Sequence, residues 1–551
     1  MLVAGGSLVG LSTAVFLGWH GIPATVVERH RGTAVHPRAA SFHRRTIELY
    51  RGVGLEAEIA EASRKEFVQG GGTVSVESLA GRELEWYRRG TNQQADALSP
   101  SAPLFITQIG LEPILRRRAE ELGARMMYGT EIVRVEADDA GVTVTMHERE
   151  SGRRRRLRAA YLVGADGARS AIREGLRMPL LGRGSFSKSV TIYFRADVTP
   201  LLRDRVVNVV YVFNPRLRGF FRFSLDGRTG FLAVNSIVDE HGRRRRDLAG
   251  DLDEKGGVAL VRQALGDPNI EVEVEDVQQW DAAASYAGRF HQGRVFLAGD
   301  SAHVMPPTGG FGGNIGVHDA HNLAWKLALV LGDVAGADLL STYDAERRPV
   351  AAFTVEQAFS RYVARLDPEL HVEDLAPVID DAIVDLGYRY RSPAVLLGRD
   401  DEAGTGEMPI EDPWTPSGRP GTRAAHVTVT RNRAPLSTLD LMGRGFVLLA
   451  GPGGESWCRA ARAAAARLDV PLTPYRTGES GDLEVPSDPT GDVSWEATTL
   501  AQAYGLEATG AVLVRPDGFI AWRAPTAGSG EAESPEDRLV RALGRLLARP
   551  G

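Results

Sequence analysis

A glycine-rich turn at the start of the chain constrains its fold more than any other feature. Residues 5–10, Gly-Gly-Ser-Leu-Val-Gly, lie between an apolar strand at 2–4 and an apolar helix at 8–20, and a second apolar strand, 24–28, ends in Glu28. Such a turn lets the backbone approach a phosphate, the helix N-terminus faces a pyrophosphate, and the acid accepts hydrogen bonds from ribose. The pattern predicts a doubly wound α/β domain with a dinucleotide site, and an ordinary strand–helix turn is the alternative.

Two further motifs follow apolar strands later in the chain. One strand ends in Asp166-Gly167, which by itself is only a turn signal. Another, at 295–298, delivers Asp300 to the carboxyl edge of a sheet, and a Pro/Gly-rich loop then leads into a helix that we expect to begin at Asn314. A carboxylate there can accept hydrogen bonds from sugar hydroxyls, and the positive end of the helix would stabilise negative charge on a flat ring held against the loop.

The period of the apolar pattern changes along the chain and predicts several regions. Helical spacing predicts a helix at 111–122, and strict alternation between 187 and 238 predicts a mostly antiparallel sheet inserted into the first domain. A Pro/Gly/acid-rich linker then precedes a small α/β domain. The predicted boundaries are 1–176 and 281–397 for the nucleotide-binding domain, 177–280 for the inserted sheet, 398–420 for the linker and 421–551 for the C-terminal domain.

Composition excludes several classes of function. The one cysteine, Cys458, rules out an intrachain disulfide and a CxxC redox pair, and a formal net charge of −6 indicates no polyanionic partner. The arginine runs 153–156 and 243–246 stand beside turn residues without interleaved aromatic residues, so we expect solvated hairpin tips and no nucleic-acid binding. His318 and His321 have metal-like spacing, but they fall in the helix after the glycine-rich loop and no metal is expected.

No segment has the pattern of an export signal or a membrane span. The apolar N-terminal stretch lacks a basic region, is interrupted by glycines and is followed directly by a second apolar strand. No other apolar run approaches the ~20 residues that a membrane-spanning helix requires. We therefore expect a cytoplasmic protein without a membrane partner.

The three motifs, in this order and spacing, resemble the group A flavoprotein monooxygenases, the family of para-hydroxybenzoate hydroxylase and phenol hydroxylase. More closely, they resemble the aromatic polyketide hydroxylases of actinomycetes, such as aklavinone 11-hydroxylase and the tetracenomycin and angucycline hydroxylases. The resemblance covers essentially the whole chain, including the segments 36–39, 45–48 and 108–112. Segments 418–421 and 514–518 resemble the thioredoxin-like third domain of these enzymes, which here lacks a CxxC pair.

This resemblance implies a Rossmann-like FAD-binding domain, an inserted antiparallel β-sheet substrate domain and a C-terminal thioredoxin-like domain. By position, the glycine-rich turn would face the pyrophosphate of FAD. Glu28 would bind the adenosine ribose, and Asp300 would bind the ribityl chain. Ser7 replaces the usual middle glycine of the turn. The residues carried over as FAD contacts are Gly5, Ser7, Gly10, Glu28, Arg29, Arg38, Gln108, Asp166, Asp300, Pro306, Gly309, Gly310, Gly312, Gly313 and Asn314.

The implied activity is hydroxylation of a polycyclic aromatic polyketide with O2 and NAD(P)H, through a C4a-hydroperoxyflavin. No second nucleotide-binding fingerprint is visible, so NADPH or NADH is expected to bind transiently. Side chains of the inserted sheet are the candidates for substrate contact by location, and no catalytic residue is identified. These candidates are Tyr193, Tyr211, Phe213, Arg222, Phe223 and Asn235, with Phe221 beside them.

Other readings of the same pattern stay open. Baeyer–Villiger insertion of oxygen next to a ketone of a polyketide would use the same cofactor. A non-redox cyclase or binding protein that keeps FAD as a structural element is the rival from a different class. A monomer and a homodimer are both compatible with the sequence.

Overall fold

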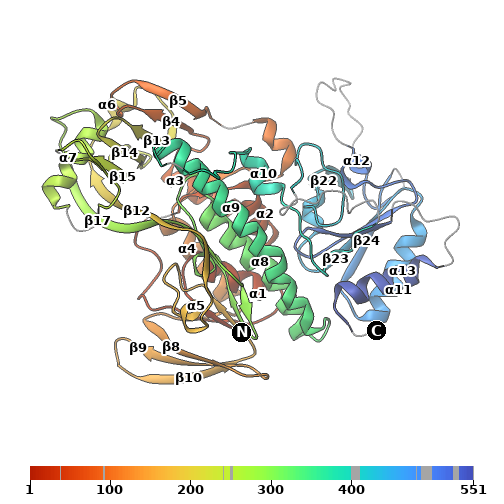
Figure 1. The fold of residues 1–551 in the computed structure, drawn as a ribbon. Coiled ribbons are helices and arrows are strands. Elements are labelled where there is room, and N and C mark those ends of the chain that lie inside the picture. The colour runs from red at the N-terminus through yellow and green to blue at the C-terminus, as the bar shows by residue number, and fades with distance from the viewer. Residues whose placement is uncertain are drawn as a thin grey trace, which may run out of the picture.

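The computed structural model describes residues 1–36, 39–90, 93–239, 241–248, 252–370, 372–398, 410–478, 481–484, 499–524 and 533–549. In Figure 1 a large sheet lies at the left, a parallel sheet with long helices at the centre, and a smaller α/β domain at the right. The mixed α/β fold predicted from the sequence is confirmed. No helix in these ranges is both long and apolar enough to cross a membrane.

A six-stranded sheet with the order β18-β19-β11-β1-β2-β7 forms the core of the first domain. Every neighbouring pair is parallel except β18–β19. The carboxyl ends of these parallel strands therefore lie at the same edge of the sheet. This edge carries the glycine turn after β1, Glu28 after β2, Asp166 after β11 and Asp300 after β19. The strands are β1 (Leu2–Ala4), β2 (Thr25–Val27), β7 (Arg125–Met127), β11 (Leu162–Gly164), β18 (His291–Gln292) and β19 (Val295–Leu297).

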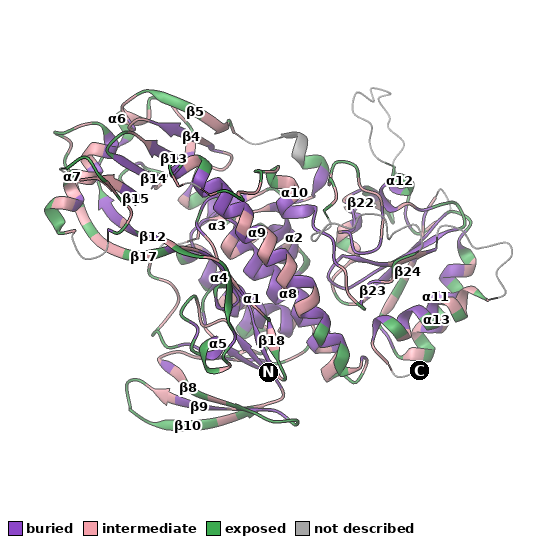
Figure 2. Cartoon of the chain, viewed as in Figure 1, coloured by how far each residue is buried: buried purple, intermediate pink, exposed green. Residues whose placement is uncertain are grey.

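Helices cover this sheet, and a separate antiparallel meander projects below it. The meander, order β10-β9-β8, is largely exposed, whereas the central helices α8 and α9 are largely buried (Figure 2). The helices are α1 (Leu8–Trp19), α2 (Arg44–Gly52), α3 (Glu56–Glu66), α4 (Gln108–Glu121), α5 (Ala171–Gly175), α8 (Phe311–Leu331), α9 (Thr342–Leu366) and α10 (Asp381–Leu386). This part of the chain also contains a short two-stranded ribbon, β3 (Ser41–Phe42) and β6 (Leu104–Phe105). The meander strands are β8 (Thr130–Ala137), β9 (Val142–Glu148) and β10 (Arg154–Ala159).

The large sheet is mostly antiparallel, as predicted, with the order β20-β17-β12-β15-β14-β13-β4-β5 and β16 paired to β15. It draws β4, β5 and β20 from outside the segment 177–280, because β4 pairs in parallel with the free edge of β13 and β20 pairs with the end of β17. The strands are β4 (Gly72–Val76), β5 (Glu83–Arg88), β12 (Leu180–Arg195), β13 (Val207–Phe213), β14 (Leu217–Phe223), β15 (Thr229–Val238), β16 (Arg244–Arg245), β17 (Glu273–Ala287) and β20 (His303–Val304).

The two faces of this sheet have different surroundings. One face carries an aliphatic cluster, including Val190, Val210 and Leu232, that packs with α7 (Glu254–Leu265). The other face carries aromatic side chains, and α9 packs against β17 and β13 on that side. The second face is thus turned toward the first domain.

The C-terminal domain has a four-stranded sheet with the order β24-β23-β25-β26. Helices α11 and α13 pack together, and Cys458, which lies in α11, is buried in the apolar cluster of this domain. The α/β prediction is confirmed, while the likeness to thioredoxin stays a prediction. The elements are β23 (Phe446–Ala450), β24 (Leu472–Arg476), β25 (Ala511–Val514), β26 (Ile520–Ala524), α11 (Glu455–Leu468), α12 (Leu500–Tyr504) and α13 (Pro535–Leu546).

Candidate active site

The glycine turn after β1 leaves no room for side chains at two positions. Gly5 has φ = +107°, and a Cβ atom added to it would lie 2.2 Å from the carbonyl oxygen of Ala165. A Cβ on Gly10 would lie 1.9 Å from the carbonyl oxygen of Gly5. The turn is therefore pressed between the end of β11 and the first turn of α1, and the N-terminus of such a helix favours a bound anion.

Ser7, which departs from the usual glycine, is hydrogen-bonded to a buried acid that sequence reasoning missed. Its hydroxyl donates to Oε1 of Glu112 at 2.5 Å, and the Leu8 amide donates to the same oxygen at 2.9 Å. The Ala34 amide donates to Oε2 at 2.6 Å. Burial raises the pKa of Glu112, and these hydrogen bonds offset part of that shift. Glu112 thus joins three separate segments at the start of α1.

Gln108 reaches the turn through Glu112. Its Nε2 donates to Oε1 of Glu112 at 3.0 Å and to the Ser7 hydroxyl at 3.3 Å, while its Oε1 accepts from the Ala39 amide at 3.1 Å. The sequence signal for this contact is the pair of polar residues Gln108 and Glu112, which lie four residues apart on a helix face that is otherwise buried. Arg38 lies outside the described residues.

Glu28 is fixed by the backbone at the end of β2. It is 8% exposed, and its two carboxylate oxygens accept from the Gly6 amide at 2.6 Å and the His30 amide at 2.8 Å. Arg29 next to it is exposed and lines a cleft with Arg31, Arg125 and residues of the meander. The predicted acid and its basic neighbour are thus both at the edge of the sheet where the turn lies.

The two aspartates at this edge have different environments. Asp166 accepts from the Ser170 hydroxyl at 2.6 Å and the Ile172 amide at 3.2 Å, so its carboxylate fixes the start of α5. Asp300 follows β19 with an exposed side chain. Asp166 therefore has a structural role in this state, and Asp300 is placed to meet a ligand.

The glycine-rich loop enters α8 through two residues in left-handed conformations. Gly309 has φ = +91° and Gly310 has φ = +71°, which side chains disfavour. Pro306 is buried, and the Thr308 hydroxyl donates to the Ala358 carbonyl of α9 at 2.6 Å. The helix begins at Phe311, three residues earlier than expected.

Gly312, Gly313 and Asn314 form the first turn of α8. A Cβ on Gly313 would lie 3.1 Å from Cδ2 of Leu8, so the loop and the α1 turn are adjacent. Asn314 is buried, and its Oδ1 accepts from the His43 amide at 2.8 Å and the Thr46 hydroxyl at 2.6 Å. Its Nδ2 donates to the Ser41 and Gly310 carbonyls at 2.9 and 2.7 Å. Asn314 therefore holds the loop through four hydrogen bonds within the protein.

A buried network of charged residues, formed by Asp319, His303 and Arg347, lies under the glycine-rich loop and stabilises it. Oδ2 of Asp319 lies 2.7 Å from Nε2 of His303, and Oδ1 accepts from Nε of Arg347 at 2.7 Å. All three side chains are fully buried. Burial works against ionisation of Asp319, but Arg347 and His303 hold its pKa below the usual value. No sequence pattern predicts this network, because Arg347 lies 28 residues from Asp319 along the chain, in another helix.

Five of the six predicted substrate-side residues share the face of the large sheet that is turned toward the first domain. Tyr193 and Arg222 are both paired with Phe231, Tyr211 is paired with Phe220, and paired residues lie on one face. Phe213 and Asn235 join them by alternation along β13 and β15.

Phe223 is the exception, and the structure does not bring it to this face. It stacks on Phe221 at 5.1 Å, and both rings contact Phe194 in the cluster that packs with α7. On the site-facing side, Asn235 donates to the Ser189 hydroxyl at 3.2 Å, and its Oδ1 is buried without a hydrogen-bond partner among the described residues. The ring of His36 lies 5.3 Å from that of Tyr193.

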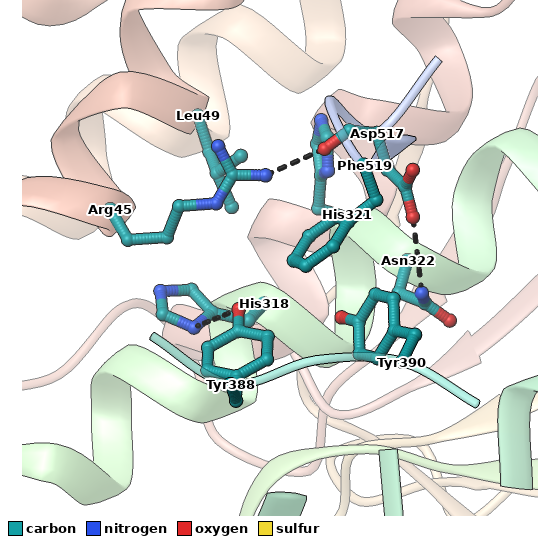
Figure 3. A pocket seen from close by; sticks show the side chains of 9 residues that line it. All are labelled: Arg45, Leu49, His318, His321, Asn322, Tyr388, Tyr390, Asp517 and Phe519. Atoms are coloured by element: carbon teal, nitrogen blue, oxygen red, sulfur yellow. Dashed lines mark hydrogen bonds between the residues drawn. The ribbon is translucent and has the colours of Figure 1, made fainter. Parts of the chain in front are cut away.

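The two histidines with metal-like spacing line a small cavity between the first domain and the C-terminal domain (Figure 3). His318 contacts the Thr46 hydroxyl at 3.1 Å and the Tyr388 hydroxyl at 3.4 Å. Within the described residues no group of three or more metal-ligating side chains occurs. The arginine runs are ion-paired, for example Arg155 with Glu148 and Arg244 with Glu369.

These buried histidines predict a loss of stability in acid. Burial lowers the pKa values of His318 and His321 well below 6.5, so both are neutral in the folded protein. Below pH 6.5 the unfolded chain binds protons that the folded chain does not, and each histidine then lowers the free energy of unfolding by up to about 1.4 kcal/mol per pH unit. Thermal midpoints between pH 7.5 and 5.5 should fall less steeply for His318→Gln than for the wild type. Equal slopes, or the same flattening in a variant of the exposed His241, would contradict this.

Comparison with known proteins agrees with this geometry. Residues 1–358 match the FAD binding domain family, and residues 417–550 match the family of the aromatic-ring hydroxylase C-terminal domain. The chain is 49% identical to the 4-methyl-5-nitrocatechol 5-monooxygenase of a Burkholderia species, over 100% of this chain and 97% of the relative. It is 39% identical to an aklavinone 12-hydroxylase of Streptomyces purpurascens, over 99% of each.

Among solved structures, a ternary complex of aklavinone-11 hydroxylase with FAD and aklavinone has a TM-score of 0.89 at 38% identity, covering 100% of this chain and 98% of that one. The residues present fit the cofactor of this family, because the tight Gly5–Gly10 turn precedes a helix N-terminus, the Glu28 carboxylate is fixed at the end of the next strand, and Gly309 and Gly310 form a loop without side chains before α8. The chain therefore belongs to the FAD-dependent aromatic-ring hydroxylases and is a flavin monooxygenase.

Proposed function

We propose that this enzyme hydroxylates an electron-rich phenolic ring of a polycyclic polyketide, using O2 and NADPH or NADH. The observation that supports this most is the placement of an aromatic-lined sheet face opposite the glycine-rich loop. Tyr193, Tyr211 and Arg222 lie on that face, and the loop closes the first domain on the other side. We expect a planar ring system to bind between two such surfaces.

The chain's own residues would hold the cofactor at one edge of the parallel sheet. The amides at the start of α1 would bind the pyrophosphate, Glu28 the adenosine ribose and Asp300 the ribityl chain. The flexible backbone of Gly309 and Gly310 would lie against the flavin ring. When bound and reduced, the flavin supplies two electrons and an activated oxygen from O2.

The remaining task of the protein is to orient the substrate and to exclude water. The packed aromatic rings of Phe186, Phe359 and Tyr362 join the long strand β12 to α9 beside the site, with ring centroids 4.8–5.0 Å apart. A dry, fixed environment favours oxygen transfer to a bound ring over loss of the oxygen to solvent. We assign no catalytic base.

A single-ring nitrocatechol is the second candidate substrate. The identity to the nitrocatechol monooxygenase, 49%, exceeds the 39% to the aklavinone hydroxylase, and both matches span nearly the whole chain. Two relatives of the whole chain are thus named for different substrates, a nitrocatechol in one case and aklavinone in the other. The substrate panel must contain both classes.

The test is oxidation of NADPH and of NADH by the FAD-loaded enzyme in air, with tetracyclic and angucyclic phenols and with nitrocatechols. We expect one scaffold class to accelerate oxidation at least tenfold, an effect of about 1.4 kcal/mol on the barrier, and to yield a product heavier by one oxygen atom from 18O2. An inserted ring oxygen, seen in the product connectivity, would favour Baeyer–Villiger chemistry. If neither nucleotide reduces the flavin with any scaffold, the hydroxylase proposal fails and a non-redox role replaces it.

A further inference from the structure

Arg222 is a buried cation without a counter-ion among the residues that the structure describes. It lies in β14 and is 8% exposed, and its side chain forms no hydrogen bond or ion pair with any residue that the structure describes. Its guanidinium lies instead 5.6 Å from the ring centroid of Phe67 and 5.5 Å from that of Phe105. Two aromatic faces offset only part of the cost of removing a cation from water.

Three other buried arginines are paired with acids, unlike Arg222. Arg347 donates to Asp319, and Arg515 donates to both Glu346 and Asp517. Arg218, on the same strand as Arg222, donates to Asp367 at 3.1 Å. A buried charge retained without a partner is characteristic of ligand-binding sites.

A second cation lies beside Arg222 and increases the excess of positive charge. The guanidinium of Arg88 is 5.6 Å from the centroid of the same Phe105 ring, and its Nε is buried without a hydrogen bond among the described residues. Burial first, and Arg88 next to it, lower the pKa of Arg222 to about 10, which leaves it charged at neutral pH. The Tyr211 hydroxyl is the one group near Arg222 that opposes this shift.

These cations border the flavin loop. Phe105 pairs with Ser41 in the β3–β6 ribbon, and the Ser41 carbonyl accepts from Asn314 at 2.9 Å. A Cβ on Gly310 would lie 3.4 Å from Cβ of Ser41. Arg222 is also on the same sheet face as Tyr193 and Tyr211. A ligand between that face and the loop would therefore meet the guanidinium.

We propose that Arg222, with Arg88 beside it, binds an anionic oxygen conjugated to the substrate ring, so that the enzyme selects acidic aromatic rings. The planar guanidinium fork matches paired oxygens such as those of an ionised hydroxyquinone, a nitro group beside a phenolate or a carboxylate. The substrate anion then supplies the counter-ion that the described residues do not provide. This inference rests on the proposed function and adds a charge requirement to it.

The test compares ionised and neutral probes of the same shape. Dissociation constants of the FAD-loaded enzyme are measured from flavin absorbance changes, without NADPH, for 4-nitrocatechol against 4-methylcatechol and for 2-hydroxy-1,4-naphthoquinone against its methyl ether. Arg222→Gln should weaken binding of each ionised probe by about tenfold or more and leave each neutral probe within about twofold. Arg222→Lys keeps the charge and should recover part of the loss. Arg216→Gln removes a positive charge from the exposed turn before β14 and should change the binding of neither the ionised nor the neutral probes.

A stability measurement separates this role from a packing role. Because Arg222 is unpaired, Arg222→Gln should leave the thermal midpoint of the ligand-free protein unchanged or raise it. A lower midpoint together with equal weakening of ionised and neutral probes would overturn the proposal, as would unchanged binding of the ionised probes. If the charge discrimination is found but no ring is ever hydroxylated, the proposed function fails while this inference stands. If neutral rings are hydroxylated and Arg222→Gln has no effect on probe binding, the proposed function stands and this inference fails.

Discussion

Arg515→Met is expected to lower the free energy of unfolding by about 3–5 kcal/mol, because it leaves buried carboxylates without their cation. Arg515 follows β25 and is fully buried. Its terminal nitrogens donate to the two oxygens of Glu346 in α9 at 2.6 and 2.8 Å. Its Nε donates to Asp517 at 3.0 Å. The residue therefore ties the C-terminal domain to a helix of the first domain.

Other charges of this network show why a single substitution has so large an effect. Burial alone would raise the pKa of Glu346, and Arg515 together with Lys326 instead holds it below the usual value. Nζ of Lys326 donates to Glu346 at 2.8 Å, and Nδ2 of Asn322 donates to Asp517 at 3.2 Å. Without Arg515, one lysine remains for two buried carboxylates.

The second variant Arg515→Met/Asp517→Asn restores the charge balance and should regain part of the loss. Thermal and urea midpoints of the FAD-loaded enzyme, followed by both circular dichroism and flavin fluorescence, provide the measurement, since a protein of several domains need not unfold in one step. Arg158→Met is the matched control, because Arg158 also makes a double contact with an acid, Asp138, but at the surface. We expect its midpoint to stay close to that of the wild type. If Arg515→Met and Arg158→Met lowered the midpoints equally, the stabilising effect of Arg515 would not come from burial of its charged network.

Gly10→Ala is expected to yield a folded protein that purifies without FAD, with cofactor affinity lowered on the order of 100-fold, or about 2.7 kcal/mol. The added Cβ would lie 1.9 Å from the Gly5 carbonyl oxygen, which must then move. Gly5 cannot move freely, since its amide donates to the Val27 carbonyl at 2.8 Å and its own Cα faces Ala165. The displaced turn would no longer present the α1 amides to the pyrophosphate.

The control for this change is Gly544→Ala. Gly544 is also a helical glycine, in α13, and no heavy atom lies within 4 Å of an added Cβ. This variant should retain flavin at the wild-type ratio of flavin to polypeptide, measured by absorbance. Circular dichroism of both variants checks the fold. Full flavin retention by Gly10→Ala would contradict the geometry described for the turn.

The sequence predicted the elements whose signals are local. The strand–turn–helix–strand pattern around Gly5 and Gly10 appears in the structure where expected, and the helix at 111–122 appears as α4, beginning at Gln108. The acids Glu28 and Asp300 meet at one sheet edge because parallel strands align their carboxyl ends. The substrate-side candidates were predicted only by their location in the inserted sheet, and the structure puts five of the six on one face. Phe223 follows Arg222 directly in β14 and therefore takes the other face.

Only the tertiary structure decided the contacts between distant segments. Strand β4 joins the large sheet through β13, and Arg515 pairs with Glu346, 169 residues earlier in the chain. No periodicity in the sequence records such pairs, because they depend on which surfaces meet after the local elements have formed. For the same reason, the sequence did not show that Glu112 binds Ser7 or that Arg222 has no counter-ion among the described residues. The sequence by itself thus determined the family and the sheet edge at which we expect the cofactor to bind, whereas burial in three dimensions determined which charged residues are paired with one another.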